Sequence, residues 1–346
     1  MFRFLPHLLL GVSLLAFWCS QADAQAAPPP TQDQVGTRWS VDQIRAAVAP
    51  IRAGESLAPK AWPNGARVAV VLSFDVDNET WMLPSGRIDL GVLSDYQYGA
   101  KEGLPRVLRL LDERKLPATF FVPAVADILS PEILPSIMKA GRHEVAIHSW
   151  IHENVEQINN AAEEERLTRQ AYDYIKEKTG KAPVGMRTGA WNASPYTIGV
   201  AEKLGLLYDS SMMAWDSPYR IIYNGKESDV IELPVTWILD DAPYFGRTGS
   251  LPSPELIFKT YKEEFDVAHE EGGYVMLTFH PQLLRRSRIN HLRVLVDYIQ
   301  AKGGVWFTTA EALARYVKAN APPKTGQRRS VKANQVSGRG SAGSDL

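Results

Sequence analysis

Hydrophobic positions alternate between two spacings along most of the chain. Short runs of Val, Ile, Leu and Phe, typical of buried strands, are separated by longer segments in which apolar residues recur at helical spacing. The expected strands are 68–74, 119–122, 144–147, 185–187, 207–209, 230–234, 274–279 and 305–308. The expected helices include 103–114, 163–178, 195–203, 254–270 and 289–301, and Ser194-Pro195 is expected to start the third of them.

This alternation predicts an α/β fold. Because each strand is followed by a helix, the strands can lie parallel with the helices outside them. Seven or eight such units favour a (β/α) barrel, distorted or incompletely closed, over an open sheet. A hydrophobic content of 45% in 346 residues is ample for a core of that size. The barrel domain is expected to span residues 61–319.

The first residues of the chain have the pattern of an export signal. Arg3 precedes an apolar run over 8–18, and Ala22 and Ala24 form a small-residue cleavage site. We therefore expect a signal peptide over 1–24, cleaved near Ala24, and a secreted or periplasmic protein. The apolar run is short for a membrane span, so we expect no span after cleavage, and a retained anchor is the alternative.

Two further segments flank the expected barrel. Residues 25–60 are expected to form a proline-rich linker and a short helix, which the capping-box residues Ser40 and Gln43 would open. Residues 320–346 lack apolar periodicity and carry several basic side chains, so we expect a disordered basic tail.

Charge and cysteine content narrow the chemistry. The net charge is −1, which gives no indication of nucleic acid binding. The single cysteine, Cys19, lies in the expected signal peptide, so the mature protein would have neither a thiol nor a disulfide. A metal ion could then have only nitrogen and oxygen ligands. A homo-oligomer is compatible with the sequence.

Polar residues occur at the carboxyl ends of the expected strands. In a β/α barrel these ends converge on one face, where catalytic residues gather, so residues far apart in sequence can meet there. The residues in such positions are Asp75, Asp77, His148, Arg187, Asp209 and His280.

Two histidines four residues apart are the strongest chemical signal. On one face of a helical turn, His148 and His152 could both reach one metal ion, and a carboxylate from another strand end would complete a three-ligand site. The alternative is that they are ordinary polar residues at a helix start. Iron oxygenases also use two histidines and one carboxylate, but usually on an all-β scaffold, which the strand–helix alternation disfavours.

Five short motifs with polar residues follow one another along the chain. They read Ser73-Phe74-Asp75-Val76-Asp77-Asn78-Glu79, His148-Ser149-Trp150-Ile151-His152, Arg187-Thr188-Gly189-Ala190-Trp191, Tyr208-Asp209-Ser210-Ser211 and Leu277-Thr278-Phe279-His280-Pro281. In this order they resemble the motifs of the polysaccharide deacetylase family (carbohydrate esterase family four), and the resemblance covers roughly residues 67–317. The extra residue between the two acids of the first motif is similar to the branch that includes allantoinase-like enzymes and some bacterial peptidoglycan deacetylases.

The resemblance implies a metal centre. Asp77, His148 and His152 would hold one divalent ion, expected to be zinc. Two neutral imidazoles and one carboxylate leave such an ion a net positive charge and open positions, so that it can acidify water and polarise a carbonyl.

The resemblance also implies three catalytic roles. Asp75 would be the general base and Arg187 would hold it in place, while His280 would be the general acid that protonates the leaving nitrogen. The alternatives are a second metal ligand for Asp75, a surface salt bridge for Arg187 and a core histidine for His280. Asp209 could orient His280 or pair with Arg187.

Several residues near these positions are expected to contact the substrate. In the family, the backbone N–H at the position of Ala190 helps to hold the oxyanion, and aromatic side chains could stack on a sugar ring. The proposed contacts are Ala190, Trp191, Asp209, Trp150 and Asp241.

Together these features predict a metal-dependent hydrolase that removes N-acetyl groups from an N-acetylated sugar of a cell-wall or extracellular polysaccharide. One alternative is hydrolysis of a small cyclic or linear amide, as in allantoinase-like enzymes. The other is a catalytically inactive glycan-binding module.

Overall fold

The computed structural model describes residues 34–246 and 252–322. The expected signal peptide, the proline-rich start of the expected linker (25–33) and most of the expected tail (323–346) lie outside these residues. No helix in the described segments is both long and apolar enough to cross a membrane.

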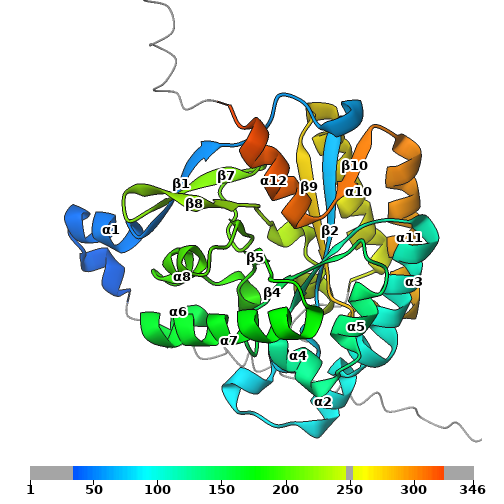
Figure 1. The fold of residues 1–346 in the computed structure, drawn as a ribbon, viewed down its shortest axis with the longest axis horizontal. Coiled ribbons are helices and arrows are strands. Elements are labelled where there is room, and N and C mark those ends of the chain that lie inside the picture. Colours follow the sequence, from blue (N-terminus) through cyan, green and yellow to red (C-terminus); the bar gives the residue numbers. More distant parts are fainter. Residues whose placement is uncertain (1–33, 247–251, 323–346) are drawn as a thin grey trace, which may run out of the picture. The chain divides into compact units, whose positions relative to one another are not determined.

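A parallel sheet forms the centre of the molecule (Figure 1). Its order runs from β2 through β3, β4, β5 and β6 to β8, and β9 pairs with β2 on the other side, all in parallel. The bounds are β2 (Val68–Asp75), β3 (Thr119–Val122), β4 (Glu144–Ile147), β5 (Gly185–Met186), β6 (Tyr208–Asp209), β8 (Lys226–Glu232), β9 (Tyr274–Phe279) and β10 (Val305–Thr308), which pairs with the first half of β2.

The expected (β/α) barrel is confirmed, and it is incompletely closed. In the part of the chain that the structure describes, no strand pairing joins β8 to β9. The seam between them is crossed by an isolated bridge from Asp240 to Thr278 and by the Tyr274 hydroxyl, which donates to the carbonyl of Pro234 at 3.1 Å. The segment after β8 therefore lies beside the end of β9.

Helices surround this sheet close to the predicted positions. Ser194-Pro195 was expected to begin the helix at 195–203, but Pro195 lies in a turn and the helix begins at Thr197, so that prediction was wrong by two residues. The helices are α2 (Leu90–Tyr96), α3 (Leu104–Arg114), α4 (Ala124–Leu129), α5 (Ile133–Met138), α6 (Val155–Ile158), α7 (Ala161–Thr179), α8 (Thr197–Lys203), α9 (Ala242–Phe245), α10 (Pro254–Glu271), α11 (Arg286–Lys302) and α12 (Ala310–Asn320), with short 3₁₀ or π turns η2 (Pro63–Gly65), η3 (Asn78–Trp81), η4 (Leu83–Ser85), η5 (Gly99–Gly103), η6 (Gly189–Trp191) and η7 (Trp237–Leu239).

The segment expected to be a linker and a short helix contains more structure than predicted. After η1 (Val35–Arg38), the helix is present as α1 (Val41–Val48), and the capping box forms, with the Ser40 N–H donating to Gln43 Oε1 at 2.8 Å and the Gln43 N–H to Ser40 Oγ at 3.2 Å. The prediction was wrong from Ile51 onward. There the chain forms β1 (Ile51–Ser56), antiparallel to β7 (Tyr219–Tyr223), which is in turn antiparallel to β8. The sheet therefore begins ten residues before the expected domain boundary at 61.

The core explains why β2 could be predicted so well. Every residue of this strand is buried. Val70 and Phe74 pack in the layer that includes the surrounding helices, whereas Val71 packs with residues of the other strands such as Phe121. A strand buried on both faces reads as a continuous apolar run. Its rigid carboxyl end carries the first two acidic residues of the candidate site.

Candidate metal centre and active site

Side chains from distant parts of the sequence line one pocket at the carboxyl ends of the strands. Asp75 and Asp77 come from the end of β2, His148 from the end of β4 and His280 from the end of β9. The convergence expected for a β/α barrel is therefore present. The lining residues are Asp75, Asp77, Trp81, Tyr96, His148, His152, Ala190, Trp191, Trp237, Asp240, Ala242, Pro243, Gly246, His280, Gln282 and Leu283.

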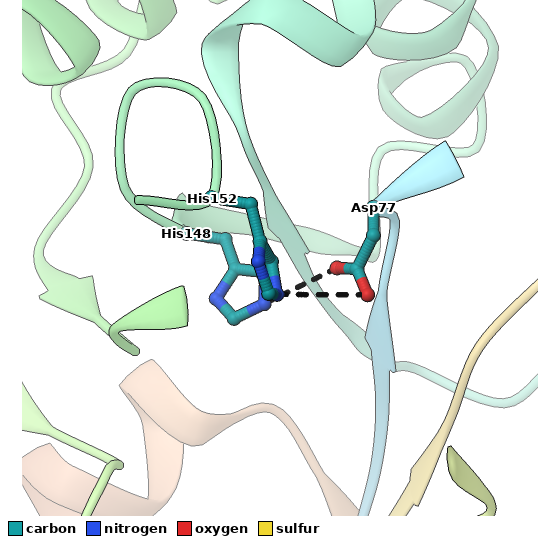
Figure 2. Close-up of side chains that lie close together, drawn as sticks. All are labelled: Asp77, His148 and His152. Atoms are coloured by element: carbon teal, nitrogen blue, oxygen red, sulfur yellow. Dashed lines mark ion pairs between the residues drawn. The ribbon is translucent and has the colours of Figure 1, made fainter. Parts of the chain in front are cut away.

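One carboxylate and two imidazoles form a compact triad in this pocket. Asp77 Oδ1 lies 3.2 Å from His148 Nε2, and Asp77 Oδ2 lies 3.7 Å from His152 Nε2. Figure 2 shows the three side chains pointing toward one another, and their ligand atoms all lie within 4.8 Å of each other. This composition and spacing can hold a metal ion.

The spacing of the two histidines predicted a helical turn, but in the structure they do not lie on one. His148 directly follows β4, and residues 149–152 form a tight loop. Ser149 and His152 have φ angles of 65° and 64°, in the left-handed region, whereas a right-handed helix requires φ near −60°. The Glu153 carboxylate closes the loop by accepting from the N–H groups of Trp150 (3.1 Å) and Ile151 (2.8 Å). The imidazoles still meet, with ring centroids 5.0 Å apart.

The hydrogen bonds around the triad fit a bound cation. The Nδ1–H of His148 donates to the carbonyl of Arg187 at 2.9 Å, so a neutral imidazole turns its Nε2 lone pair toward Asp77. Asp77 Oδ1 is buried, and no group of the described residues donates a hydrogen bond to it. Two electron-rich atoms 3.2 Å apart repel one another unless a cation or a proton lies between them.

The pKa values of the triad lead to the same conclusion. Burial opposes the ionisation of Asp77, but His152, His280 and His148 outweigh it and hold the pKa of this carboxyl far below its usual range. Burial lowers the pKa of His152 to about 4, so this ligand is neutral at neutral pH. For His148, burial is outweighed by Asp75 and Asp77, which raise its pKa and would equally favour a metal ion.

Asp75 is held beside the triad by two donors. Arg187 Nη1 donates to Asp75 Oδ1 at 2.6 Å, and the indole N–H of Trp191 donates to Asp75 Oδ2 at 3.2 Å. The alternative that Arg187 forms a surface salt bridge is wrong, because its side chain is fully buried and its guanidinium lies 3.9 Å from the ring centroid of Phe121. The carboxylate is thereby fixed in one orientation at the pocket wall.

His280 has a different environment across the pocket. Its Nδ1–H donates to Asp241 Oδ1 at 2.7 Å, and its Nε2 lies 3.3 Å from Asp77 Oδ2. Burial disfavours a charged imidazole, but Asp77, Asp240 and Asp241 outweigh it and raise the pKa of His280 well above its usual value. The imidazole can therefore carry a proton at neutral pH and present it to the pocket.

The expectation that Asp209 orients His280 or pairs with Arg187 was wrong. Asp209 accepts hydrogen bonds from the N–H and the hydroxyl of Ser211, both at 3.0 Å, and it is absent from the pocket wall. Arg187 instead donates to the Ser210 carbonyl at 3.0 Å. The partner of His280 is Asp241, which reaches it because the Asp240–Thr278 bridge crosses the barrel seam.

Only some of the expected substrate contacts line the pocket. Ala190 and Trp191 line the pocket, and the Ala190 N–H donates to His152 Nε2 at 3.3 Å. Asp209, Asp241 and Trp150 do not line it. Asp241 is occupied by His280, and Trp150 is half-buried against Tyr174, because it lies on the outer side of the histidine loop.

Aromatic pairs and one acid complete the wall. Trp81 stacks on Tyr96 with centroids 5.9 Å apart, and Trp191 stacks on Trp237 at 4.3 Å. Burial raises the pKa of Asp240 to about 7. The sequence interpretation missed Gln282, whose Nε2 lies 3.4 Å from Asp77 Oδ2. Its position two residues after His280, in the turn that follows β9, was the available signal.

The chain is similar to known proteins in sequence and in fold. A family model described as polysaccharide deacetylase matches residues 89–208. A crystal structure from Mycobacterium smegmatis, assigned as a polysaccharide deacetylase, is 34% identical, covers 78% of this chain and 96% of its own, and superimposes with a TM-score of 0.70. An allantoinase structure is 25% identical. The match covers 75% of this chain and 92% of the allantoinase chain, with a TM-score of 0.66.

A sequence comparison also finds a relative that is named a peptidoglycan deacetylase. The peptidoglycan deacetylase of Helicobacter pylori is 29% identical over 255 residues, which are 64% of this chain and 86% of that protein. The ordered strand ends, the shared fold and these similarities agree, and this chain belongs to the polysaccharide deacetylase family.

Proposed function

We propose that the protein is a metal-dependent hydrolase that removes acetyl groups from an N-acetylated sugar of a cell-wall or extracellular polysaccharide. The observation that carries this proposal is the meeting of three groups in one pocket: a triad that can hold a metal ion, a buried carboxylate held by Arg187, and a histidine held by Asp241. The similarity to proteins named polysaccharide or peptidoglycan deacetylases supports the substrate class.

Asp77, His148 and His152 would hold the metal ion, which we propose to be zinc because the ligands are two imidazoles and one carboxylate. When bound, a divalent ion of this kind polarises the acetyl carbonyl and acidifies water. Gln282 would steady the carboxylate, since its amide lies near the outer oxygen of Asp77.

Asp75 would accept the proton of the attacking water. Arg187 and Trp191 hold both of its oxygens, so the carboxylate meets the water in a fixed orientation. The N–H of Ala190 donates to His152 Nε2, and we propose that it would turn to the negatively charged oxygen of the tetrahedral intermediate once that nitrogen serves as a metal ligand.

His280 would donate a proton to the departing nitrogen. An amine leaves only after protonation, so the C–N bond breaks as Nε2 gives up its proton, and acetate and a free amine result. Asp241 holds the opposite nitrogen and stabilises the charged imidazole before the transfer.

A second candidate is hydrolysis of a small cyclic amide. The similarity to an allantoinase over most of both chains favours it, and the same base, acid and metal would serve that reaction. In either case, we propose that residues 1–24 are a signal peptide and that the barrel domain acts outside the cytoplasm. N-terminal sequencing of the exported protein should then begin at Gln25.

An acetate-release assay tests the main proposal. The purified protein should release acetate from N-acetylated glycans, lose this activity with a chelator and regain it with zinc, and the Asp75→Asn variant serves as the inactive control. Ring opening of allantoin without acetate release from any glycan would favour the second candidate. Binding to glycans without turnover of either substrate would indicate an inactive glycan-binding module.

A further inference from the structure

A groove with excess positive charge lies outside the catalytic pocket, between α3 and α11. The two helices lie side by side on one flank of the barrel (Figure 1). Four guanidinium groups line the groove, those of Arg106, Arg109, Arg286 and Arg293, and Leu110 and Ile289 provide its apolar part.

The positions of the arginines concentrate positive charge on the two helices. Arg106 and Arg109 are three residues apart on α3, so they share one face of that helix, and Arg286 and Arg293 are seven apart on α11. Like charges three residues apart, as in Arg106 and Arg109, repel and destabilise the helix that carries them. A binding partner with negative charge would remove that penalty.

The acids nearby neutralise only part of this charge. Glu102 accepts from Arg106 Nη2 at 2.7 Å, and Glu113 pairs with Arg114 at 3.0 Å. The side chains of Arg109 and Arg286 form no hydrogen bond or ion pair with any residue that the structure describes. The pKa of Glu102 is lowered first by the hydrogen bond from Arg106 and then also by the charges of Arg286 and Arg109.

The other end of the same helix pair is fully paired. Arg114 donates to Asp297 through Nε at 2.7 Å and Nη2 at 3.0 Å, which joins α3 to α11. The two helices are thus linked by a bidentate ion pair near one end of the groove, while the arginines within it retain donors for another molecule.

The groove begins close to the catalytic pocket. Gly103, just before α3, packs against the carbonyl of Pro281 so closely that no side chain fits there. Pro281 follows His280, and Gln282 and Leu283 line the catalytic pocket before α11 starts at Arg286. The segment that lines the pocket therefore leads within a few residues to the start of the groove.

We propose that this groove binds an anionic substituent, a carboxylate or a phosphate, of the polysaccharide whose acetylated sugar occupies the catalytic pocket. The inference rests on the proposed function for the identity of that polysaccharide. Arginine forks match carboxylate and phosphate oxygens. The groove encloses about 220 Å³, less than the roughly 300–1,000 Å³ of pockets that enclose whole ligands, so it suits one group of a larger molecule.

The test compares two double variants of the full chain. Arg109→Gln/Arg286→Gln empties the groove of its two unpaired charges, and Arg166→Gln/Arg169→Gln removes the same charge from the exposed face of α7. Binding is measured by co-sedimentation with purified peptidoglycan at low temperature and low salt. The groove variant should bind roughly tenfold more weakly, and the α7 control should bind as the parent does.

Three further preparations identify the anion. If the difference disappears on carboxyl-amidated peptidoglycan, the group is a carboxylate, and if it disappears after removal of phosphodiester-linked polymers, the group is a phosphate. On a neutral N-acetylated chitin oligosaccharide, both variants should bind and turn over as the parent does. The difference should shrink at high salt, because mobile ions screen exposed charges.

Equal affinity of the parent and the groove variant for peptidoglycan would overturn the inference. An equal loss in the α7 control, or tighter binding of the parent to DNA than to peptidoglycan, would overturn it as well. These failures differ from failure of the proposed function. Acetate release with no groove effect rejects only this inference, whereas a groove effect with no turnover of any acetylated substrate rejects only the proposed reaction.

Discussion

Two clusters of histidine and aspartate face each other across the pocket, and the Nδ1–H of each histidine donates to a different kind of acceptor. In the first, His148 donates its Nδ1 proton to a main-chain carbonyl and turns Nε2 toward Asp77, whose Oδ1 has no donor among the described residues. In the second, His280 donates its Nδ1 proton to a carboxylate, Asp241, and a second acid, Asp240, lies 3.5 Å from the same nitrogen.

Composition and distance do not separate these clusters, because each has three ligand atoms within 4.8 Å of one another. What distinguishes the two clusters is the group that each histidine's Nδ1–H contacts. The Arg187 carbonyl holds a proton of His148 on Nδ1, so that a neutral ring turns its Nε2 lone pair toward Asp77. The two carboxylates beside Nδ1 of His280 instead favour the charged, proton-carrying ring. The comparison therefore supports the proposal that the first cluster binds the metal ion and the second transfers the proton.

Replacing one member of the first cluster should have the largest effect. His148→Ala or His152→Ala removes one of three ligands, so we expect the ion to dissociate on dialysis and hydrolysis to fall below detection. Metal content by mass spectrometry, together with acetate release, measures this. His280→Ala is the matched control and should keep one ion per chain. Full metal occupancy in both ligand variants would show that the first cluster does not hold the metal ion.

The two acids of β2 should differ in the same way. Asp75→Asn should keep the metal and lose on the order of 10²–10⁴ in rate, the usual contribution of one general base. Asp77→Asn should instead weaken metal binding. If the Asp75 variant loses the ion and the Asp77 variant retains it, the roles assigned to the two carboxylates are exchanged.

The second cluster should control the alkaline side of the pH profile. The pKa of His280 lies well above its usual value, so the acid stays protonated at neutral pH and kcat/KM should fall only as pH rises through that raised pKa. Asp241→Asn removes one of the charges that raise it, so the alkaline limb should move to lower pH.

His280→Ala should remove that limb altogether while leaving the ion in place. The rate should fall on the order of 10²-fold or more for an amide, and less for an activated aryl ester, whose leaving group hardly needs a proton. Equal losses on both substrates would mean that His280 orients the substrate and does not donate the proton.

The smallest effect should come from the indole that supports the base. Trp191→Phe removes the N–H that reaches Asp75 at 3.2 Å but preserves an aromatic ring against Trp237. We expect a loss of about tenfold in kcat, which corresponds to one hydrogen bond to a charged group, with unchanged metal content. Trp237→Phe, which leaves that hydrogen bond intact, is the control. A loss as large as that of Asp75→Asn would show that the indole has a role beyond holding the base.

Several strands could be predicted from the sequence because they are mostly apolar. The predicted bounds of β3, β4, β9 and β10 match the structure, and each is a short apolar run between polar loops. Strand β1 could not be found in this way. Its sequence, Ile-Arg-Ala-Gly-Glu-Ser, is mostly polar and half-exposed, and it becomes a strand only because β7 offers an edge to pair with.

The same limit applies to the site. Strand ends placed Asp75, Asp77, His148 and His280 together, since parallel strands share one face of a barrel. The pairing of His280 with Asp241 was not predictable, because it depends on how the segment after β8 crosses the open seam to Thr278. The spacing of His148 and His152 indicated a helix, but the loop reaches the same convergence through left-handed residues.

Those left-handed residues have a consequence for how such a protein can change over time. Ser149, His152, Ala190 and Trp191 have φ angles between 52° and 65°, and two contacts, from the Gly189 N–H to Ser149 Oγ and from the Ala190 N–H to His152 Nε2, join the two loops. Each such residue costs roughly 1–3 kcal/mol relative to a relaxed backbone. Glycine or asparagine would adopt these angles at lower cost, so folding stability alone does not favour the residues present. A descendant that no longer needs its chemistry is therefore free to relax both loops, keep the barrel and become the more stable protein.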